Sequence, residues 1–440
     1  MGFVISALLL LIGIFFHKKN KTFACPETLF CYEWGMISFL SSLRLFDLYD
    51  VGLKTWLIIF IGSLSFVFGC ALGKKMIVAN GGGQLVKKKD STPVLYFALS
   101  IILLIISLYQ FIPSFRLLRQ GYTLDQIRLA SYNIVEINGL SPVSKIGEYL
   151  NLVKSSLEIF VVAFGIERFI SNFKKNFLYI VPVVILVVLE IFTNGGRFVI
   201  AYFVLELLVC LSIYMKKGKF LSKKLSKKSK RIVFVLIALA TFLMILITVL
   251  RGSQMSELAK KYYRYTCGNT VFLDYHIKRL DINEIQSYSF AGFFGFWSFV
   301  LPIFHFFGCD YPSLYLTCID KVMVGQEFVE VGKDLSTNAF LSSFYHLYAD
   351  YRFFGVVAGM FLFGVFCGLV YKKAMINDRP LFVAMYLISS QMIFKSLQDY
   401  FLSSSQYFIP AVIILIIVIV GKGRKEFKTN KLFVKRESGT

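Results

Sequence analysis

The sequence predicts an all-α polytopic membrane protein that forms a single integral membrane domain over residues 1–440. Hydrophobic residues make up 57% of the chain and charged residues only 17%, and the mean hydropathy is +0.67. Soluble globular domains are more polar than this. Apolar runs of about 20 residues, the length that crosses a bilayer as a helix, also recur along the chain. The fold class follows from these two observations.

The charge pattern supports the same class. The net charge is +22, which in a soluble protein would suggest nucleic-acid binding. Here the basic residues form short blocks between apolar runs, a pattern typical of cytoplasmic loops. These blocks are His17–Lys21, Gly73–Lys89, Lys174–Lys175, Lys216–Arg231, Lys372–Arg379 and Lys422–Arg436. We therefore predict a membrane protein that does not bind nucleic acid.

About eleven transmembrane helices place all of these blocks on one side of the membrane. The first apolar run has no basic region before it and no small-residue cleavage site, so we interpret it as a span and not as a cleaved signal. The second run is interrupted by Glu33 and Arg44. The N-terminus is then expected outside and the C-terminus in the cytoplasm. The predicted spans cover 2–16, 29–45, 53–72, 92–112, 149–170, 177–193, 197–214, 232–250, 353–371, 380–397 and 406–420.

The large outer loop, residues 251–352, is the predicted functional part. It contains three of the four histidines, His276, His305 and His346. Within it, residues 290–307 are apolar but interrupted by Pro302. A full crossing there would put the basic block at 372–379 outside, so we expect a re-entrant or interfacial hairpin in this segment.

Arginines gather on the predicted outer side, whereas the inner blocks consist mostly of lysine. Arginine carries a planar fork that binds phosphate through two hydrogen bonds, so the outer set suggests a phosphate-bearing ligand. For the arginines at span ends the alternative is that they reach to the lipid headgroups. For those near 116–128 it is an amphipathic helix lying on anionic lipid. The set is Arg116, Arg119, Arg128, Arg197, Arg251, Arg264, Arg279 and Arg352.

His346 and Asp350 are the predicted base and its orienting carboxylate. They are four residues apart, so they share one helical face. The alternative is a solvated polar face of a helix next to the membrane. His276, His305 and Glu327 are further candidates for the base. Two weaker features are the Asp47 and Asp50 pair, which could bind a metal, and eight cysteines without metal-ligand spacing. We expect neither a metal nor a cofactor.

Three segments resemble the Wzy-type oligosaccharide repeat-unit polymerases, which lengthen O-antigen and capsular polysaccharides. Thr193–Arg197, TNGGR, is similar to a small-residue turn with an arginine between two mid-chain spans. Val249–Ser253, VLRGS, has an arginine that closes the span before the large outer loop. Ser336–Gly355 resembles the Asn-containing, Tyr-rich approach to the next span. The number of spans and the position of the large loop extend this resemblance to the whole chain.

The resemblance implies a helical fold of the C-type glycosyltransferase kind in the bacterial cytoplasmic membrane. It implies a metal-independent, inverting transfer of a glycan held on undecaprenyl pyrophosphate to the next lipid-linked repeat unit. A chain-length regulator and a flippase would be partners, together with membrane lipids. The residue pattern, and not the resemblance, gives His346 and Asp350 as the catalytic residues. The outer arginines and the resemblance together give as substrate-binding residues Arg197, Arg251, Arg264, Arg279, Asn338 and Arg352.

Two other functions stay open at this point. A ligase that moves a finished glycan to another acceptor would share the spans, the outer loop and the arginines. A flippase for polysaccharide or lipid-linked sugars would need polar residues along a path through several spans. The charges inside the predicted spans are few, mainly Glu158, Glu167, Glu190, Glu206 and Lys395.

Overall fold

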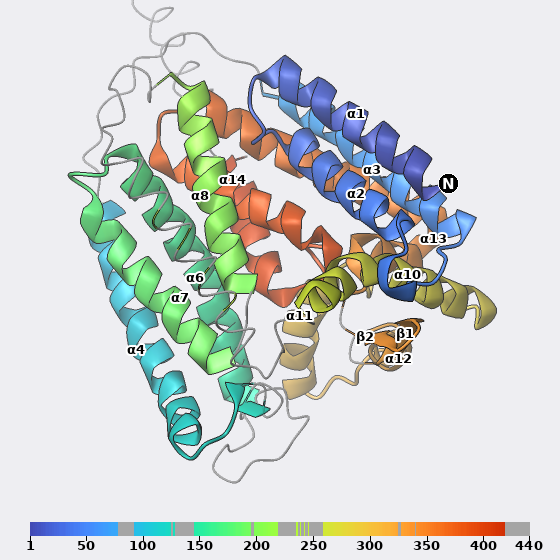
Figure 1. Ribbon diagram of the computed structural model, residues 1–440. Helices are drawn as coiled ribbons and strands as arrows, with labels where there is room; N and C mark the ends of the chain where they lie inside the picture. Colours follow the sequence, from blue (N-terminus) through green and yellow to red (C-terminus); the bar gives the residue numbers. More distant parts are fainter. Residues whose placement is uncertain are drawn as a thin grey trace, which may run out of the picture.

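The computed structural model describes residues 1–77, 92–124, 126–127, 145–194, 198–218, 258–323, 327–338 and 340–418, together with residues 235, 238, 242 and 245. In this part of the chain the fold is helical apart from one two-stranded hairpin. This confirms an all-α membrane protein. Figure 1 shows two groups of helices with α14, Pro380–Phe394, between them.

The first group contains α1, α2 and α3, which cover Gly2–Asn20, Pro26–Ser42 and Leu53–Lys75. Pro26 occupies the first turn of α2, where its missing N–H and fixed φ favour helix initiation. Asp274 caps α3 from another element, because its Oδ1 accepts from the Gly52 N–H at 3.0 Å and from the Thr55 hydroxyl at 2.6 Å. The N-terminus of α3 is thereby tied to the outer loop.

The second group lies on the opposite side of α14 (Figure 1). It contains α4 at Thr92–Arg119, α6 at Lys145–Ser171, the 3-10 helix η2 at Phe177–Tyr179, α7 at Ile180–Asn194 and α8 at Phe198–Lys216. Helix α14 packs against α2, α6, α8 and α13. Its central place explains why its apolar residues are buried on all sides.

Helix α13, Ser342–Ile376, crosses α3 at very short range. A Cβ added to Gly69 would lie 2.1 Å from the Phe361 carbonyl oxygen, and one added to Gly364 would lie 2.1 Å from the Phe66 carbonyl oxygen. Gly73 and Gly368 make the same kind of approach one turn further along. Each helix therefore presents a Gly-x-x-x-Gly face, which lets two membrane helices meet backbone to backbone.

Six helices among the described residues are long and apolar enough to cross a membrane. The structure therefore supports a multi-pass membrane protein. The predicted spans at 29–45 and 149–170 form α2 and α6, which are outside this set. Helix α2 has only 17 residues, and α6 carries Lys154, Glu158 and Glu167. Of the predicted span 232–250, only residues 235, 238, 242 and 245 are described. The six helices are Gly2–Asn20, Leu53–Lys75, Pro93–Arg119, Phe198–Lys216, Ser342–Ile376 and Pro380–Leu397; shorter apolar helices cover Phe177–Thr193, Phe294–Phe306 and Ser405–Val418.

The predicted outer loop folds into short elements. These are α10 at Leu258–Ile282, α11 at Phe294–Phe306, α12 at Ser313–Lys321, and the antiparallel strands β1 at Val329–Gly332 and β2 at Leu335–Thr337. Helix α11 has 13 residues, about 20 Å of helix, which is shorter than the roughly 30 Å hydrocarbon core of a bilayer. Its placement as a re-entrant or interfacial segment stays a prediction.

Candidate functional site

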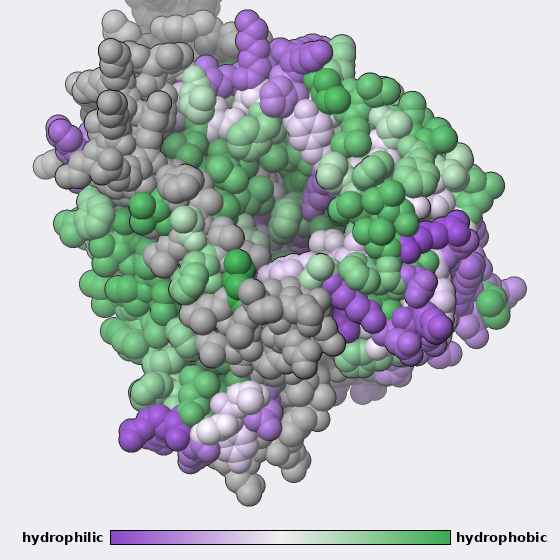
Figure 2. Space-filling model, viewed as in Figure 1, coloured by the Kyte–Doolittle hydropathy of each residue, from purple (hydrophilic) through white to green (hydrophobic). Residues whose placement is uncertain are grey.

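Five aromatic side chains connect the predicted outer loop to the helix bundle. Ring centroids lie 6.0 Å apart for Tyr265 and Phe340, and 5.5 Å apart for Phe340 and Phe198. The series continues from Phe198 to Tyr202 at 6.2 Å and from Tyr202 to Phe394 at 5.9 Å. We call these residues the aromatic arc. It joins α10, the segment after β2, α8 and α14. Figure 2 shows the surface hollowed between α8 and α2, with both polar and apolar residues in the wall.

Arg264 stands at the α10 end of the aromatic arc. Its guanidinium lies 5.0 Å from the centre of the Tyr265 ring, a cation–π distance. The side chain is half-buried, and its Nε is buried without a hydrogen-bond partner in the part of the chain that the structure describes. No carboxylate there forms an ion pair with it. Arg264 therefore lies beside the arc without an ion-pair partner among the described residues.

The other two predicted arginines of the loop that are described differ from Arg264, because carboxylates already contact them. Arg279 forms an ion pair with Glu327. Arg352 lies 3.8 Å from the Asp281 carboxylate and donates to the Leu280 carbonyl at 3.3 Å. Either would have to exchange an existing partner in order to bind a phosphate.

A polar cluster lies at the other end of the arc, formed by His346, Lys395 and Asp399. The Tyr202 hydroxyl donates to Gln398 Oε1 at 3.4 Å and so links the arc to this cluster. Lys395 Nζ lies 3.0 Å from Asp399 Oδ2 and 2.9 Å from Ser404 Oγ. Both Lys395 and Asp399 are within electrostatic reach of His346.

The orientation of His346 is fixed by its own helix. Its Nδ1 lies 3.0 Å from the Ser342 carbonyl oxygen. A carbonyl oxygen only accepts hydrogen bonds, so Nδ1 must carry the proton and Nε2 keeps the lone pair. The first turn of α13 is anchored in turn, because the Ser342 N–H donates to the Gln398 carbonyl at 2.9 Å and the Ser343 hydroxyl donates to the Asp399 carbonyl at 2.9 Å. A neutral imidazole held in this tautomer can accept a proton.

Asp350 has a different set of partners from the one that the sequence predicted. Its carboxylate accepts from the Ser287 hydroxyl at 2.7 Å, and from the backbone N–H groups of Ala291 at 3.1 Å and Gly292 at 2.8 Å. In the described residues, the hydrogen bonds of this carboxylate go to the segment before α11 and none goes to His346, which is within electrostatic reach. Asp350 therefore organises the approach to α11, while the Ser342 carbonyl orients the histidine.

Helix α13 bends sharply directly after Asp350. Tyr351 and Arg352 have non-helical backbone angles, and Arg352 has a φ of 54°, a value that L side chains adopt at a cost. Asp281 lies beside the bend and accepts from the Tyr348 hydroxyl at 2.7 Å and from Lys54 Nζ at 2.6 Å. Together with Arg352 these groups hold α3, α10 and α13 together. The bend directs the segment with His346 away from the membrane-crossing part of the helix.

The other two histidines of the loop lie elsewhere. His276 is fully buried between Phe272 and Tyr345, with ring centroids 4.4 and 5.7 Å away. Burial, with a smaller contribution from Arg279, lowers the pKa of His276 to about 4. His305 is exposed, bonds the Cys309 carbonyl through Nδ1 at 3.1 Å and stacks on Tyr311. Neither belongs to the polar cluster.

Of the remaining predicted site residues, two are described and two are not. Asn338 is half-buried and lies two residues before Phe340 of the aromatic arc. Glu327 is exposed and pairs with Arg279. Arg197 and Arg251 lie outside the described residues, although Arg197 directly precedes Phe198 in the sequence.

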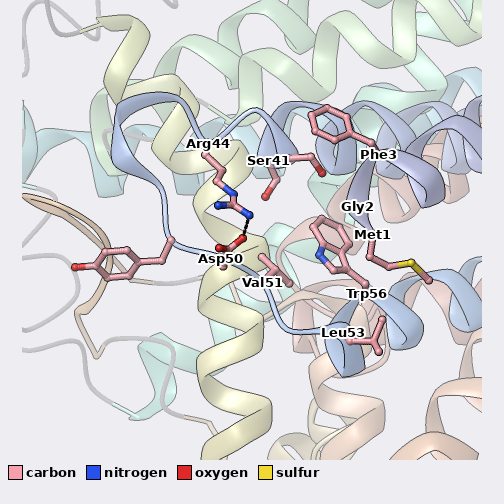
Figure 3. Close-up of a pocket in the computed structure, with 11 residues that line it drawn as sticks. Met1, Gly2, Phe3, Ser41, Arg44, Asp50, Val51, Leu53 and Trp56 are labelled. Atoms are coloured by element: carbon pink, nitrogen blue, oxygen red, sulfur yellow. Dashed lines mark ion pairs between the residues drawn. The ribbon is translucent and has the colours of Figure 1, made fainter.

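The segment with Asp47 and Asp50 borders a small pocket between the ends of α1, α2 and α3 (Figure 3). Its volume is about 170 Å³, below the range of about 300–1,000 Å³ typical of ligand sites. Asp50 forms an ion pair with Arg44 across its mouth. Among the described residues no group of three or more histidine, cysteine or acidic side chains could hold a metal ion.

Sequence reasoning missed the Lys395 and Asp399 pair. The two residues are four apart, and Asp399 falls in the predicted outer segment that follows span 380–397. That spacing was a usable signal. Their neighbourhood with His346 depends on how α13 and α14 pack, which a single sequence does not give. No family model matches the chain, and no curated protein or solved structure matches it.

Proposed function

We propose that this chain is a polymerase that joins undecaprenyl-pyrophosphate-linked oligosaccharide repeat units into a surface polysaccharide. The reaction would take place at the outer face of the bacterial cytoplasmic membrane. The main support is that an oriented imidazole and a guanidinium without a described ion-pair partner lie at the two ends of one aromatic arc. Glycosyl transfer from a pyrophosphate needs both groups, a base for the acceptor and a cation for the leaving group.

His346 is the proposed general base. As the acceptor hydroxyl attacks the anomeric carbon, its proton moves to Nε2, and the bond from that carbon to the pyrophosphate oxygen breaks. The resulting imidazolium is stabilised by Asp399, which is within electrostatic reach. A single displacement of this kind inverts the anomeric centre and needs no metal or cofactor.

Arg264 is the proposed cation for the leaving group, together with Arg197 and Arg251 from the resemblance. Negative charge develops on the pyrophosphate during the transfer, and guanidinium groups already in place lower the barrier. Arg279 and Arg352 serve this role less well, because carboxylates contact both of them. The flat faces of the aromatic arc, with Asn338 beside them, suit the sugar rings between the two charged ends.

Matched variants test these roles in cells and with purified protein. We expect His346→Ala to abolish chain growth and His305→Ala to leave it normal, with lipid-linked repeat binding retained in both. Arg264→Lys should reduce polymer strongly, because lysine keeps the charge but lacks the fork. Arg279→Lys is the control and should have the smaller effect. Normal polymer from His346→Ala and Arg264→Lys at normal protein levels would refute this site.

A further inference from the structure

Helix α8 carries a polar stripe through the membrane. Tyr202, Glu206, Cys210 and Tyr214 follow one another at intervals of four residues, so they lie on one face of the helix. Helix α8, Phe198–Lys216, is one of the helices long and apolar enough to span the bilayer, and Glu206 lies at its middle. Ionisable groups at this depth are costly and commonly functional.

Among the described residues, Glu206 has no group that neutralises it. The residue is fully buried, and neither carboxyl oxygen has a hydrogen-bond partner in the described part of the chain. An ionised carboxylate in such surroundings would cost far more than its protonated form. Burial without a described partner therefore favours the protonated form of this side chain.

Several other acidic residues of the described helices have a cationic or hydroxyl partner, whereas Glu33 of α2, like Glu206, has a buried carboxyl oxygen without a described partner. Glu190 and Glu158 lie 3.0 and 3.9 Å from the ammonium group of Lys154. Glu27 lies 2.5 Å from Lys74 Nζ, and Glu167 accepts from the Tyr214 hydroxyl. Glu206 has no such partner among the described residues.

A series of polar groups leads from Glu206 toward the polar cluster. Tyr407 is within electrostatic reach of Glu206, Tyr202 and Asp399. Lys395 Nζ lies 4.5 Å from the centre of the Tyr407 ring and 3.0 Å from Asp399. The Asp399 side chain is 30% exposed. Exchangeable groups thus extend from the neighbourhood of Glu206 to the partly exposed Asp399, and a proton would cross the first gap by way of a water molecule or a side-chain movement, because Glu206 itself forms no hydrogen bond with the described residues.

Charged and titratable groups also face this stripe from the neighbouring helices. Glu33 of α2 is within electrostatic reach of Tyr202, as is Asp399. Glu167 of α6 is within reach of Cys210, on the side of Glu206 away from Tyr202. Cys210 and Tyr214 lie between Glu206 and the basic end of α8. The polar groups that lead to the polar cluster, Tyr202 and Tyr407, lie on the opposite side of Glu206.

We propose that Glu206 is a proton-binding site inside the membrane, which exchanges its proton with the outer surface through Tyr202, Tyr407 and the Lys395–Asp399 pair. The ligand is a proton, and the site stands independently of the polymerase proposal. The protonation of the Glu206 carboxyl group therefore depends on the pH at the polar cluster.

A hydrophobic carbodiimide tests the site in the full-length protein reconstituted in vesicles of known orientation. The acid adds across one C=N bond of the reagent, its proton moving to nitrogen, so the adduct contains the whole reagent and is found by peptide mass spectrometry. We expect an adduct at Glu206 that disappears in Glu206→Gln, with Glu27, which pairs with Lys74, unmodified as the control. Labelling should fall when the pH at the outer face is raised, and should respond more slowly in Asp399→Asn.

Infrared spectroscopy tests the same site without a reagent. A carboxylic acid C=O band that shifts in D₂O should be present in the wild type and absent in Glu206→Gln. Absence of this band in the wild type would overturn the proposal, whether or not the carbodiimide reaches the residue. Labelling that follows only the pH at the inner face, or ignores pH on both faces, would overturn the outward route.

Discussion

The crossing of α3 and α13 gives the most quantitative prediction. A Cβ at Gly364 would lie 2.1 Å from the Phe66 carbonyl oxygen, whereas close C–H···O contacts are usually no shorter than about 3.3 Å. Gly364→Ala must therefore push the helices apart by about 1 Å, a gap that forfeits roughly a quarter to a half of each dispersion contact across the crossing. Overpacking of this kind costs about 1–3 kcal/mol.

Gly268→Ala is the matched control. Gly268 lies in α10, and a Cβ there would meet nothing closer than 3.4 Å, an ordinary contact. Both substitutions gain up to about 1 kcal/mol of helix propensity, so the difference between them isolates the clash. We expect Gly364→Ala to unfold about 1–3 kcal/mol more easily than Gly268→Ala. Thermal unfolding of the purified proteins in the same detergent measures this, and equal stability of the two variants would refute the close crossing.

The other predictions concern pH, topology and the site. The folded pKa of His276 is about 4 and its ordinary value is 6.5, so only the unfolded chain binds a proton between these pH values. Stability should thus be lost as pH falls from 6.5 toward 4, by about 1.4 kcal/mol per unit; thermal unfolding across this range should show no such extra loss in His276→Leu. Cys309 is exposed and the other seven cysteines are buried, so an impermeant maleimide added to intact cells should label it, and labelling only after lysis would place the loop inside. Arg197→Lys and Arg251→Lys should lower polymer yield strongly at normal protein levels, and wild-type yield would favour headgroup contacts. Asp350→Asn should reduce polymer less than loss of the base does, and a complete loss would show that the segment before α11 is essential.

Much of the fold could be predicted because apolar length and charge placement are local properties of the sequence. The runs at 53–72, 197–214 and 380–397 became α3, α8 and the α14 segment, each near its predicted bounds. The bend in α13 could not be predicted. It occurs at Tyr351 and Arg352 without a proline or glycine at either position, and it depends on contacts with Asp281 and Asp350 from distant segments.

The residue types of the site could be predicted from the sequence, but the contacts that these residues make could not. The sequence placed His346 and Arg264 in the outer loop, and the structure puts them at the two ends of the aromatic arc. It could not foresee that Glu327 would pair with Arg279, since they are 48 residues apart. Nor could it foresee that Asp350 would accept from backbone N–H groups near 291–292. Long-range pairing of this kind is fixed by tertiary packing and leaves no periodic signal.

Analysis of lipid-linked glycans in a deletion strain tests the central proposal most directly. If the chain is the polymerase, single repeat units on undecaprenyl pyrophosphate should accumulate at the outer face, and the wild-type gene should restore long polymer where His346→Ala does not. Long polymer still held on the lipid carrier would contradict this and identify a ligase. Repeat units confined to the inner face would contradict it as well, and would identify a flippase.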